Sequence, residues 1–204
     1  MFRLDELDQV DYLRKVQAVY AGVRDRRIPA EQRWQYWVAA RNELFGHHAA
    51  SPLAPAQRAH FINLAYFPYD PALRFAVDVD IDVAPELLAV AGAPAKRVGR
   101  VHFAVAGSTL SLSVFALQSY GGGLLLPFAD ASAQSGKTYA PGRWLLDGAH
   151  GADLGEENGK LVLDFNFAYN PASAYAAAGF EVPAENRLAL AIPAGEQLYP
   201  AAAA

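Results

Sequence analysis

Polar side chains of fixed hydrogen-bonding geometry gather in the stretch from Tyr120 to Pro171. Short apolar runs that indicate buried strands alternate there with turn residues and with Asp, Asn, Arg and Tyr. The alternation in Asp164-Phe165-Asn166 would put the carboxylate and the amide on one face of a strand and the phenyl ring on the other. This mixture is typical of a binding or catalytic site, and it does not identify a reaction.

We predict that polar strand ends and loops form a small-molecule pocket in a β-barrel or sandwich. In this pocket Arg143 would bind an anionic group such as a carboxylate or phosphate. The Asp and Asn side chains would orient the ligand, and the aromatic side chains would stack on it. The candidate residues are Tyr139, Arg143, Asp164, Asn166, Tyr169, Asn170, Glu185 and Arg187.

Two other interpretations remain open for the same residues. One is an enzyme in which Asp164 or Glu185 is the general base, with its pKa raised by burial near aromatic residues. The other is a buried hydrogen-bond network that fixes the geometry of the loops. In that case the protein would be structural, and its Trp- and Tyr-rich helical arm would dock on a partner or on a second copy as a homodimer.

The loop Ala131–Thr138 resembles a phosphate-binding P-loop, but Tyr139–Gly142 cannot continue as the helix that the motif requires. We therefore expect an exposed loop between two strands. No Gly-x-Ser-x-Gly elbow occurs, and we expect His102 and His150 to be ordinary structural residues. The chain has no cysteine, so thiol nucleophiles and disulfides are excluded.

No metal site is expected. Three alternating aspartates at Asp78, Asp80 and Asp82 lack the turn glycine and the closing glutamate of a calcium loop, and a solvated strand face accounts for them better. His47 and His48 are adjacent, His60 lies further on, and no acidic residue stands among them.

Apolar spacing of three to four residues predicts an amphipathic helix over Leu4–Val23 and a second helix from Pro29 to Gly46. The rest of the chain predicts strands. A hairpin is expected from Val101–Val105 and Leu110–Leu117, and the turn Asn158-Gly159 precedes the strand Leu161–Phe167. The other predicted strands are Phe75–Val83, Leu124–Phe128, Arg143–Leu146 and Leu188–Ile192.

These elements predict an α+β, mainly β fold: an antiparallel β-barrel or sandwich with an N-terminal helical arm. The arm would span residues 1–50 and the β-rich part residues 51–200 of a single structural domain. Residues 201–204, all alanine, would form a disordered tail.

The 204 residues are 53% hydrophobic and 19% charged, which is the composition of a globular domain. The formal net charge of −4 argues against a nucleic-acid or anionic-membrane surface, because both require clustered Lys and Arg. No apolar run approaches membrane-spanning length, and the N-terminus lacks the layout of a signal peptide. We expect a soluble, cytoplasmic protein.

Several ordered motifs resemble the bacterial family catalogued as domain of unknown function 1684. They are Leu44–His47 with Ser51–Leu53, Tyr66–Pro71, Leu126–Phe128 with Asp130, Thr138-Tyr139 with Gly142-Arg143, Leu163–Asn166, Ala168–Pro171 and Glu185–Leu188. The resemblance covers nearly the whole chain but implies no established activity. It implies a relation to the flavin-binding split barrels, which makes FMN the one named candidate for an otherwise unknown cofactor.

Overall fold

The computed structural model describes residues 4–176 and 179–199, so the predicted tail 201–204 lies outside the described residues. Both predicted long helices are confirmed: α1 spans Leu4–Val23 and α2 spans Ala30–His47. Pro29 stands directly before α2 with φ −53°, where its missing N–H leaves no helical hydrogen bond unmade. A single-turn helix, α3, follows at Pro55–Arg58.

All named strands pair antiparallel, in two sheets. The larger sheet has the order β2-β4-β5-β6-β7, with β3 also paired to β4. Its strands are β2 Val79–Asp80, β3 Leu87–Val90, β4 Ala93–Val105, β5 Ser108–Leu117, β6 Leu124–Phe128 and β7 Arg143–Asp147. The smaller sheet has the order β1-β9-β8, formed by β1 Arg74–Val77, β9 Lys160–Asp164 and β8 Glu156–Glu157.

The two sheets share one hydrophobic core. Val77 of β1 and Leu163 of β9 pack there with Val101, Leu112 and Leu126 of the larger sheet. Neither sheet closes on itself within the described residues, so the predicted α+β, mainly β fold is an open sandwich or split-barrel-like arrangement and not a closed barrel.

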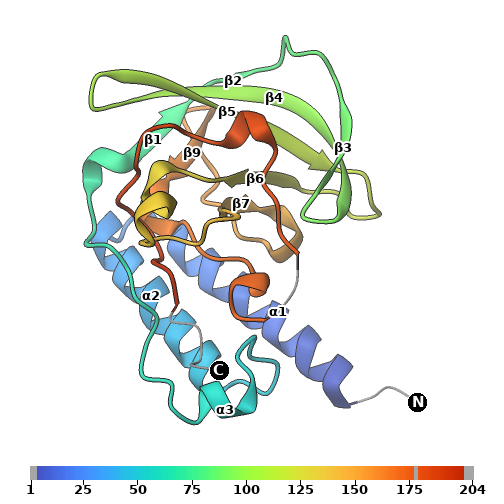
Figure 1. The fold of residues 1–204 in the computed structure, drawn as a ribbon, viewed down its shortest axis with the longest axis vertical. Helices are drawn as coiled ribbons and strands as arrows, with labels where there is room; N and C mark the ends of the chain where they lie inside the picture. Colours follow the sequence, from blue (N-terminus) through green and yellow to red (C-terminus); the bar gives the residue numbers. More distant parts are fainter. Residues whose placement is uncertain (1–3, 177–178, 200–204) are drawn as a thin grey trace.

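The helical arm packs against the body of its own chain. Val19 and Val23 of α1 and Trp37 of α2 are buried in a second core with Val162 and Phe167. In Figure 1 the blue helices lie on one side of the strands, and the long hairpin of β4 and β5 lies on the opposite side. The helices α1 and α2 therefore cover one side of the two-sheet body.

Three predicted strands differ in the structure. The run Phe75–Val83 is divided at Asp78, because β1 pairs with β9 whereas β2 pairs with β4 of the other sheet. At the crossing, a Cβ on Gly99 would lie 2.5 Å from Val79 Cγ1, so this place in β4 requires glycine. The division lets one apolar run serve both sheets.

The predicted strand Leu161–Phe167 ends at Asp164. The Asp164 side chain accepts a hydrogen bond from the Asn166 backbone N–H and starts a 3₁₀ turn over Phe165–Phe167. The predicted strand Leu188–Ile192 is an irregular segment, joined to the residues after β6 by the isolated bridge between Ala129 and Arg187. Both strands were predicted from apolar content, which does not distinguish a strand from an apolar turn or strap.

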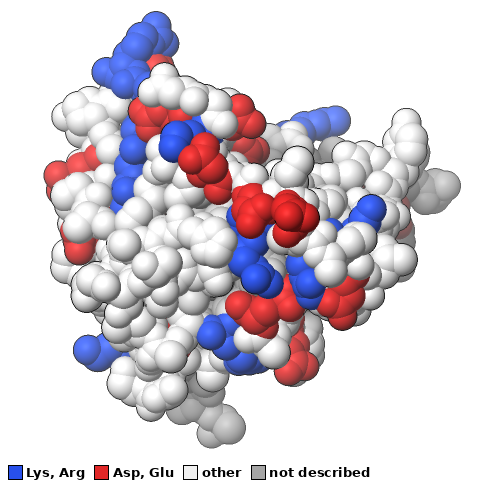
Figure 2. All heavy atoms as spheres, turned by 90° about the horizontal axis from the view of Figure 1, so that it is seen from above, with Lys and Arg blue, Asp and Glu red and all other residues white. Residues whose placement is uncertain are grey.

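Charged side chains of both signs are interspersed on the face of the molecule shown in Figure 2. Arg97 of β4 illustrates this, because it pairs with both Glu86 and Glu185. Among the described residues, no helix has the length and apolarity needed to cross a membrane.

Candidate functional site

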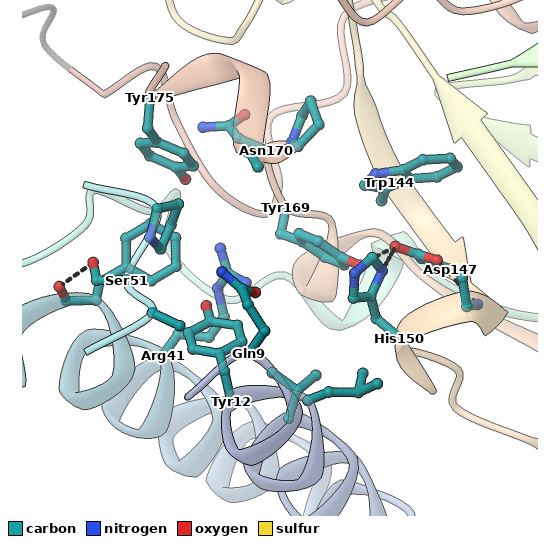
Figure 3. A pocket seen from close by; sticks show the side chains of 18 of the residues that line it. Gln9, Tyr12, Arg41, Ser51, Trp144, Asp147, His150, Tyr169, Asn170 and Tyr175 are labelled. Atoms are coloured by element: carbon teal, nitrogen blue, oxygen red, sulfur yellow. Dashed lines mark hydrogen bonds and ion pairs between the residues drawn. The ribbon is translucent and has the colours of Figure 1, made fainter. Parts of the chain in front are cut away.

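A cavity of about 470 Å³ lies between the helical arm and the end of β7. Its walls come from α1, α2, the loop around Ser51, β7 with the turn that follows it, and the segment from Tyr169 to Tyr175. Figure 3 shows these side chains pointing into a common space from elements far apart in the sequence. The cavity lies where the arm meets the body of the domain.

Aromatic rings dominate the lining. Tyr175 and Phe45 meet edge to face, with ring centroids 4.9 Å apart, and thereby fix each other's orientation. Apolar side chains of α1, Leu13 and Val16, complete the helical wall. The aromatic lining residues are Tyr12, Tyr20, Phe45, Trp144, Tyr169 and Tyr175.

Arg41 of α2 reaches the cavity with its charge already compensated. Its Nη2 donates to Glu196 Oε2 at 2.7 Å, and the Glu196 side chain is fully buried. The guanidinium also lies 4.8 Å from the ring centroid of Tyr169, within range of a cation–π interaction. Burial disfavours the charge of Arg41, but Glu196 and the surrounding phenol oxygens outweigh it and raise the pKa of Arg41 well above its ordinary value.

Glu196 holds two further parts of the wall in place. Its carboxylate accepts a hydrogen bond from the backbone N–H of Asn170 at 2.9 Å and another from the hydroxyl of Tyr175. Burial, and then the charge of Glu196, raise the pKa of Tyr175 well above its ordinary value. A single buried carboxylate thus fixes α2 and the segment from Asn170 to Tyr175 around the cavity.

The opposite side of the cavity carries an aspartate–histidine pair. Asp147 Oδ2 lies 2.6 Å from His150 Nδ1 and accepts a hydrogen bond from the Tyr169 hydroxyl at 3.1 Å. Asp147 is buried, whereas the His150 side chain is 57% exposed. The hydrogen bond to Asp147 raises the pKa of His150, and partial burial opposes this effect.

The turn after β7, which carries His150, is fixed by backbone hydrogen bonds and by two glycines. Asp147 and Ala152 exchange two backbone hydrogen bonds of 2.9 Å and close the loop between them. A Cβ on Gly148 would lie 2.7 Å from the backbone nitrogen of Leu124, and Gly151 has φ +68°, so both positions favour glycine. The Asp147 side chain also accepts from the Ala149 N–H at 3.1 Å, which fixes the carboxylate beside the imidazole.

Tyr169 joins the two sides. Trp144 and Tyr169 exchange backbone hydrogen bonds of 2.8 and 3.0 Å, which holds the segment against β7. Figure 3 shows the Tyr169 ring between Arg41 and Asp147. Burial raises the pKa of the Tyr169 phenol well above its ordinary value, so this group stays a hydrogen-bond donor to Asp147.

Of the eight residues predicted as a ligand site, Tyr169 and Asn170 line this cavity. Asn170 donates from Nδ2 to the backbone oxygen of Gln197 at 2.8 Å. Its buried Oδ1 has no hydrogen-bond partner among the described residues. Asn170 therefore ties this part of the cavity wall to the C-terminal segment.

Arg143 lies in a separate, buried network. The residue is 1% exposed, and its Nη2 donates to Asp130 Oδ2 at 2.7 Å. Its guanidinium also donates to the backbone oxygens of Ile192, Ala194 and Glu196. The anionic group that Arg143 binds in the structure is therefore an aspartate of its own chain, and these contacts tie the C-terminal segment to β7.

Asp164 and Asn166 form another buried cluster. Asn166 accepts from the Asp70 N–H and donates to the Asp70 carbonyl, both at 2.8 Å, and its Nδ2 donates to Asp164 Oδ1 at 2.7 Å. The Asn166 carbonyl accepts from Trp34 Nε1 of α2. Burial raises the pKa of Asp164 to about 6, and the hydrogen bonds from Asn166 oppose this rise.

The other three predicted residues lie elsewhere. The Tyr139 hydroxyl donates to the carbonyl of Ser173 at 3.2 Å, Glu185 pairs with Arg97 at 2.8 Å, and Arg187 lies 3.8 Å from Glu181. None of the three lines the cavity. The structure therefore does not bring the eight predicted residues together in one site.

Sequence reasoning missed three residues that line the cavity, Arg41, Asp147 and His150, and it missed Glu196, which is buried behind the wall and pairs with Arg41. The spacing of Asp147 and His150 in a Gly-rich turn after an apolar run was the one local signal available. Arg41 and Glu196 are 155 positions apart, and no local pattern predicts their contact.

FMN does not fit the polar groups of this cavity. Its phosphate needs free donors of positive charge. Among the described lining residues no lysine occurs, and the single arginine, Arg41, is neutralised by Glu196. The described residues also contain no group of three His, Cys, Asp or Glu side chains arranged to hold a metal ion.

A family model described as "Protein of unknown function (DUF1684)" matches residues 59–197. Among solved structures, the chain is similar to the solution NMR structure of an uncharacterized protein from Haloarcula marismortui. The sequence identity is 26%, the TM-score is 0.59, and the similarity covers 82% of this chain and 93% of that one. A comparison with curated proteins gives no match.

Proposed function

The chain belongs to the DUF1684 family of proteins of unknown function, and from this starting point we propose that its cavity binds a small organic molecule that carries a ring. The observation that carries the proposal is a cavity of about 470 Å³ that is lined by six aromatic side chains and bordered by the Arg41–Glu196 ion pair and the hydrogen-bonded pair of Asp147 and His150. Ligand pockets of small molecules are of this size and character.

The apolar part of the ligand is expected between the rings. Tyr169 and Trp144 on one side and Val16 on the other offer flat and branched apolar surfaces. An aromatic or other ring inserted between them replaces water on apolar surface, which stabilises the complex. Because Arg41 is already paired, binding does not depend on a net negative charge of the ligand.

Polar recognition then depends on few groups. His150 and Asn170 both line the cavity. A ligand with a ring and a hydrogen-bonding substituent satisfies this combination. Glu196 fixes the backbone of Asn170, and Asp147 fixes the imidazole of His150, so little ordering is required when the ligand enters.

The proposal is tested by isothermal titration with para-nitroanisole, a ring compound without an acidic proton. Val16 faces the cavity from α1, and Val16→Trp fills part of the space, so affinity should fall at least about tenfold, or about 1.4 kcal/mol. Ala18→Trp is the matched control, because Ala18 is exposed on the same helix and does not line the cavity.

Saturable binding by the wild type and Ala18→Trp, lost in Val16→Trp, would support the proposal. Absence of saturable binding by the wild type, or equal binding by both variants, would contradict it. An absorbance scan and native mass spectrum of freshly purified wild type would add the mass and the colour of any ligand carried through purification.

A second candidate function is an enzyme with Asp164 as the general base. The pKa of Asp164 favours this candidate. Burial raises it to about 6, which is closer to neutral pH than the pKa of an ordinary carboxyl group. If this candidate is correct, Asp164→Asn loses the activity while the protein stays folded; a variant with full activity would remove the candidate.

A further inference from the structure

Resting on the proposed function, we propose that His150 is a proton acceptor of the cavity and that the ligand is a phenol, a ring bearing an acidic hydroxyl group. The hydroxyl would donate to Nε2 of His150 while the ring lies among the aromatic side chains. This assigns a ligand class and a proton-transfer step to the cavity.

The orientation of the imidazole supports this role. Nδ1 faces the Asp147 carboxylate at 2.6 Å, so Nδ1 carries the hydrogen and Nε2 carries the lone pair of the neutral ring. Nε2 has no hydrogen-bond partner within the described part of the chain. The side chain is 57% exposed and borders the cavity, so the lone pair is accessible to a ligand.

The carboxylate is held in place by three donors. Asp147 Oδ1 accepts from the Ala149 N–H, and Oδ2 faces His150 Nδ1 and accepts from the Tyr169 hydroxyl. A buried carboxylate in this position fixes the tautomer of the imidazole and stabilises the imidazolium that forms when Nε2 receives a proton. The raised pKa of His150, caused first by this hydrogen bond, agrees with the geometry.

The neighbours of His150 do not provide a competing acceptor that titrates near neutral pH. Besides Asp147 of β7, the surrounding charged or titratable groups are Tyr169, Tyr20 of α1, and Arg24 directly after α1. Arg24 Nη1 lies 3.5 Å from the Gly151 oxygen and pairs with Asp153. Burial raises the pKa of Tyr20 and of Tyr169, so both phenols keep their protons. His150 is therefore the group of this set that exchanges a proton with a ligand.

The step conserves atoms and charge without another reactant. The O–H bond of the ligand breaks, its electron pair stays on the oxygen, and an N–H bond forms at Nε2. A phenol suits the step because its ring spreads the charge of the oxyanion. The resulting phenolate and imidazolium lie side by side, and their attraction is strengthened where the cavity excludes water.

The test uses para-nitrophenol, whose ionisation is visible as a colour change, beside para-nitroanisole, which has no proton to give. At protein concentrations that bind all of the probe, we expect the ionisation midpoint of para-nitrophenol to fall by about one pH unit relative to the free probe, a tenfold change. His150→Gln should remove this shift. His47→Gln should keep it, because His47 is an exposed histidine that does not line the cavity.

An unshifted midpoint in the wild type, or the same shift in His150→Gln, would overturn the inference while leaving the binding of para-nitroanisole to support the proposed function. If neither probe binds in a saturable manner, the proposed function fails and the inference fails with it.

Discussion

Asp164 shows how a single buried carboxyl group makes stability depend on pH. Its folded-state pKa of about 6 lies above the ordinary value of 3.8, so between these two values the folded state binds more protons than the unfolded state. The free energy of unfolding therefore decreases as the pH rises through this interval. At neutral pH the ionised, buried carboxylate of Asp164 therefore lowers the stability of the folded state.

We predict that Asp164→Asn raises the free energy of unfolding above about pH 7 by about 2 to 3 kcal/mol, and that the difference disappears below about pH 4. The amide oxygen of Asn can still accept the two hydrogen bonds that Asn166 donates. Urea unfolding over this pH range measures the effect. A variant that is less stable than the wild type at neutral pH would show that the charge of Asp164 is needed beside Arg74 and Arg33.

Individual residues were predictable from sequence only where local pattern carries their role. Tyr169 and Asn170 belong to a turn signal, Tyr-Asn-Pro, and they do line the cavity. The sequence did not single out His150, because its neighbour Asp147 is held by Tyr169, which lies 22 positions further along the chain. Glu196 follows Gly195 in a polar-looking segment, and nothing local predicts that its carboxylate is fully buried.

At the scale of elements, helices and tight hairpins were predicted and irregular apolar segments were not. The three- to four-residue apolar spacing of Leu4–Val23 and the apolar alternation of Val101–Val105 in β4 indicate an element buried on one face, and both patterns are visible in the sequence. Leu188–Ile192 is also apolar, but its backbone N–H groups donate to the Ala129 carbonyl and the Asp130 carboxylate and not to a neighbouring strand. These partners are long-range and leave no periodic trace.

The same C-terminal segment depends on Arg143. This arginine is 1% exposed, pairs with Asp130, and donates to three backbone oxygens of residues 192–196. We predict that Arg143→Ala lowers the free energy of unfolding by about 3 to 5 kcal/mol, because it leaves the Asp130 charge buried without its partner. Chemical denaturation provides the measurement.

Arg14→Ala is the matched control for this variant. Arg14 is exposed on α1, and its removal should change stability by no more than about 0.5 kcal/mol. If Arg143→Ala kept wild-type stability and lost ligand binding, Arg143 would be a ligand-binding residue, as the sequence alone suggested, and not a support of the fold.

The whole molecule places its cavity at the junction of the arm and the two-sheet body. The sandwich class was predictable from short strands and turn signals without alternating helices. The position of the cavity was not, because it depends on how the arm docks: α1 and α2 bury Val19, Val23 and Trp37 against their own chain and thereby bring Val16 and Arg41 opposite β7. Sequence showed an apolar helix face but not the surface that receives it.

The central claim is that a ring compound binds between α1 and the end of β7, and the location of a bound ring tests it most directly. Isotope-labelled protein saturated with para-nitroanisole can be examined by intermolecular nuclear Overhauser effects. We predict contacts from the probe to the Val16 methyl groups and to the rings of Tyr169 and Trp144. Contacts confined to exposed apolar residues such as Ile62, Ile81 or Leu87 would contradict the assignment of this cavity as the binding site.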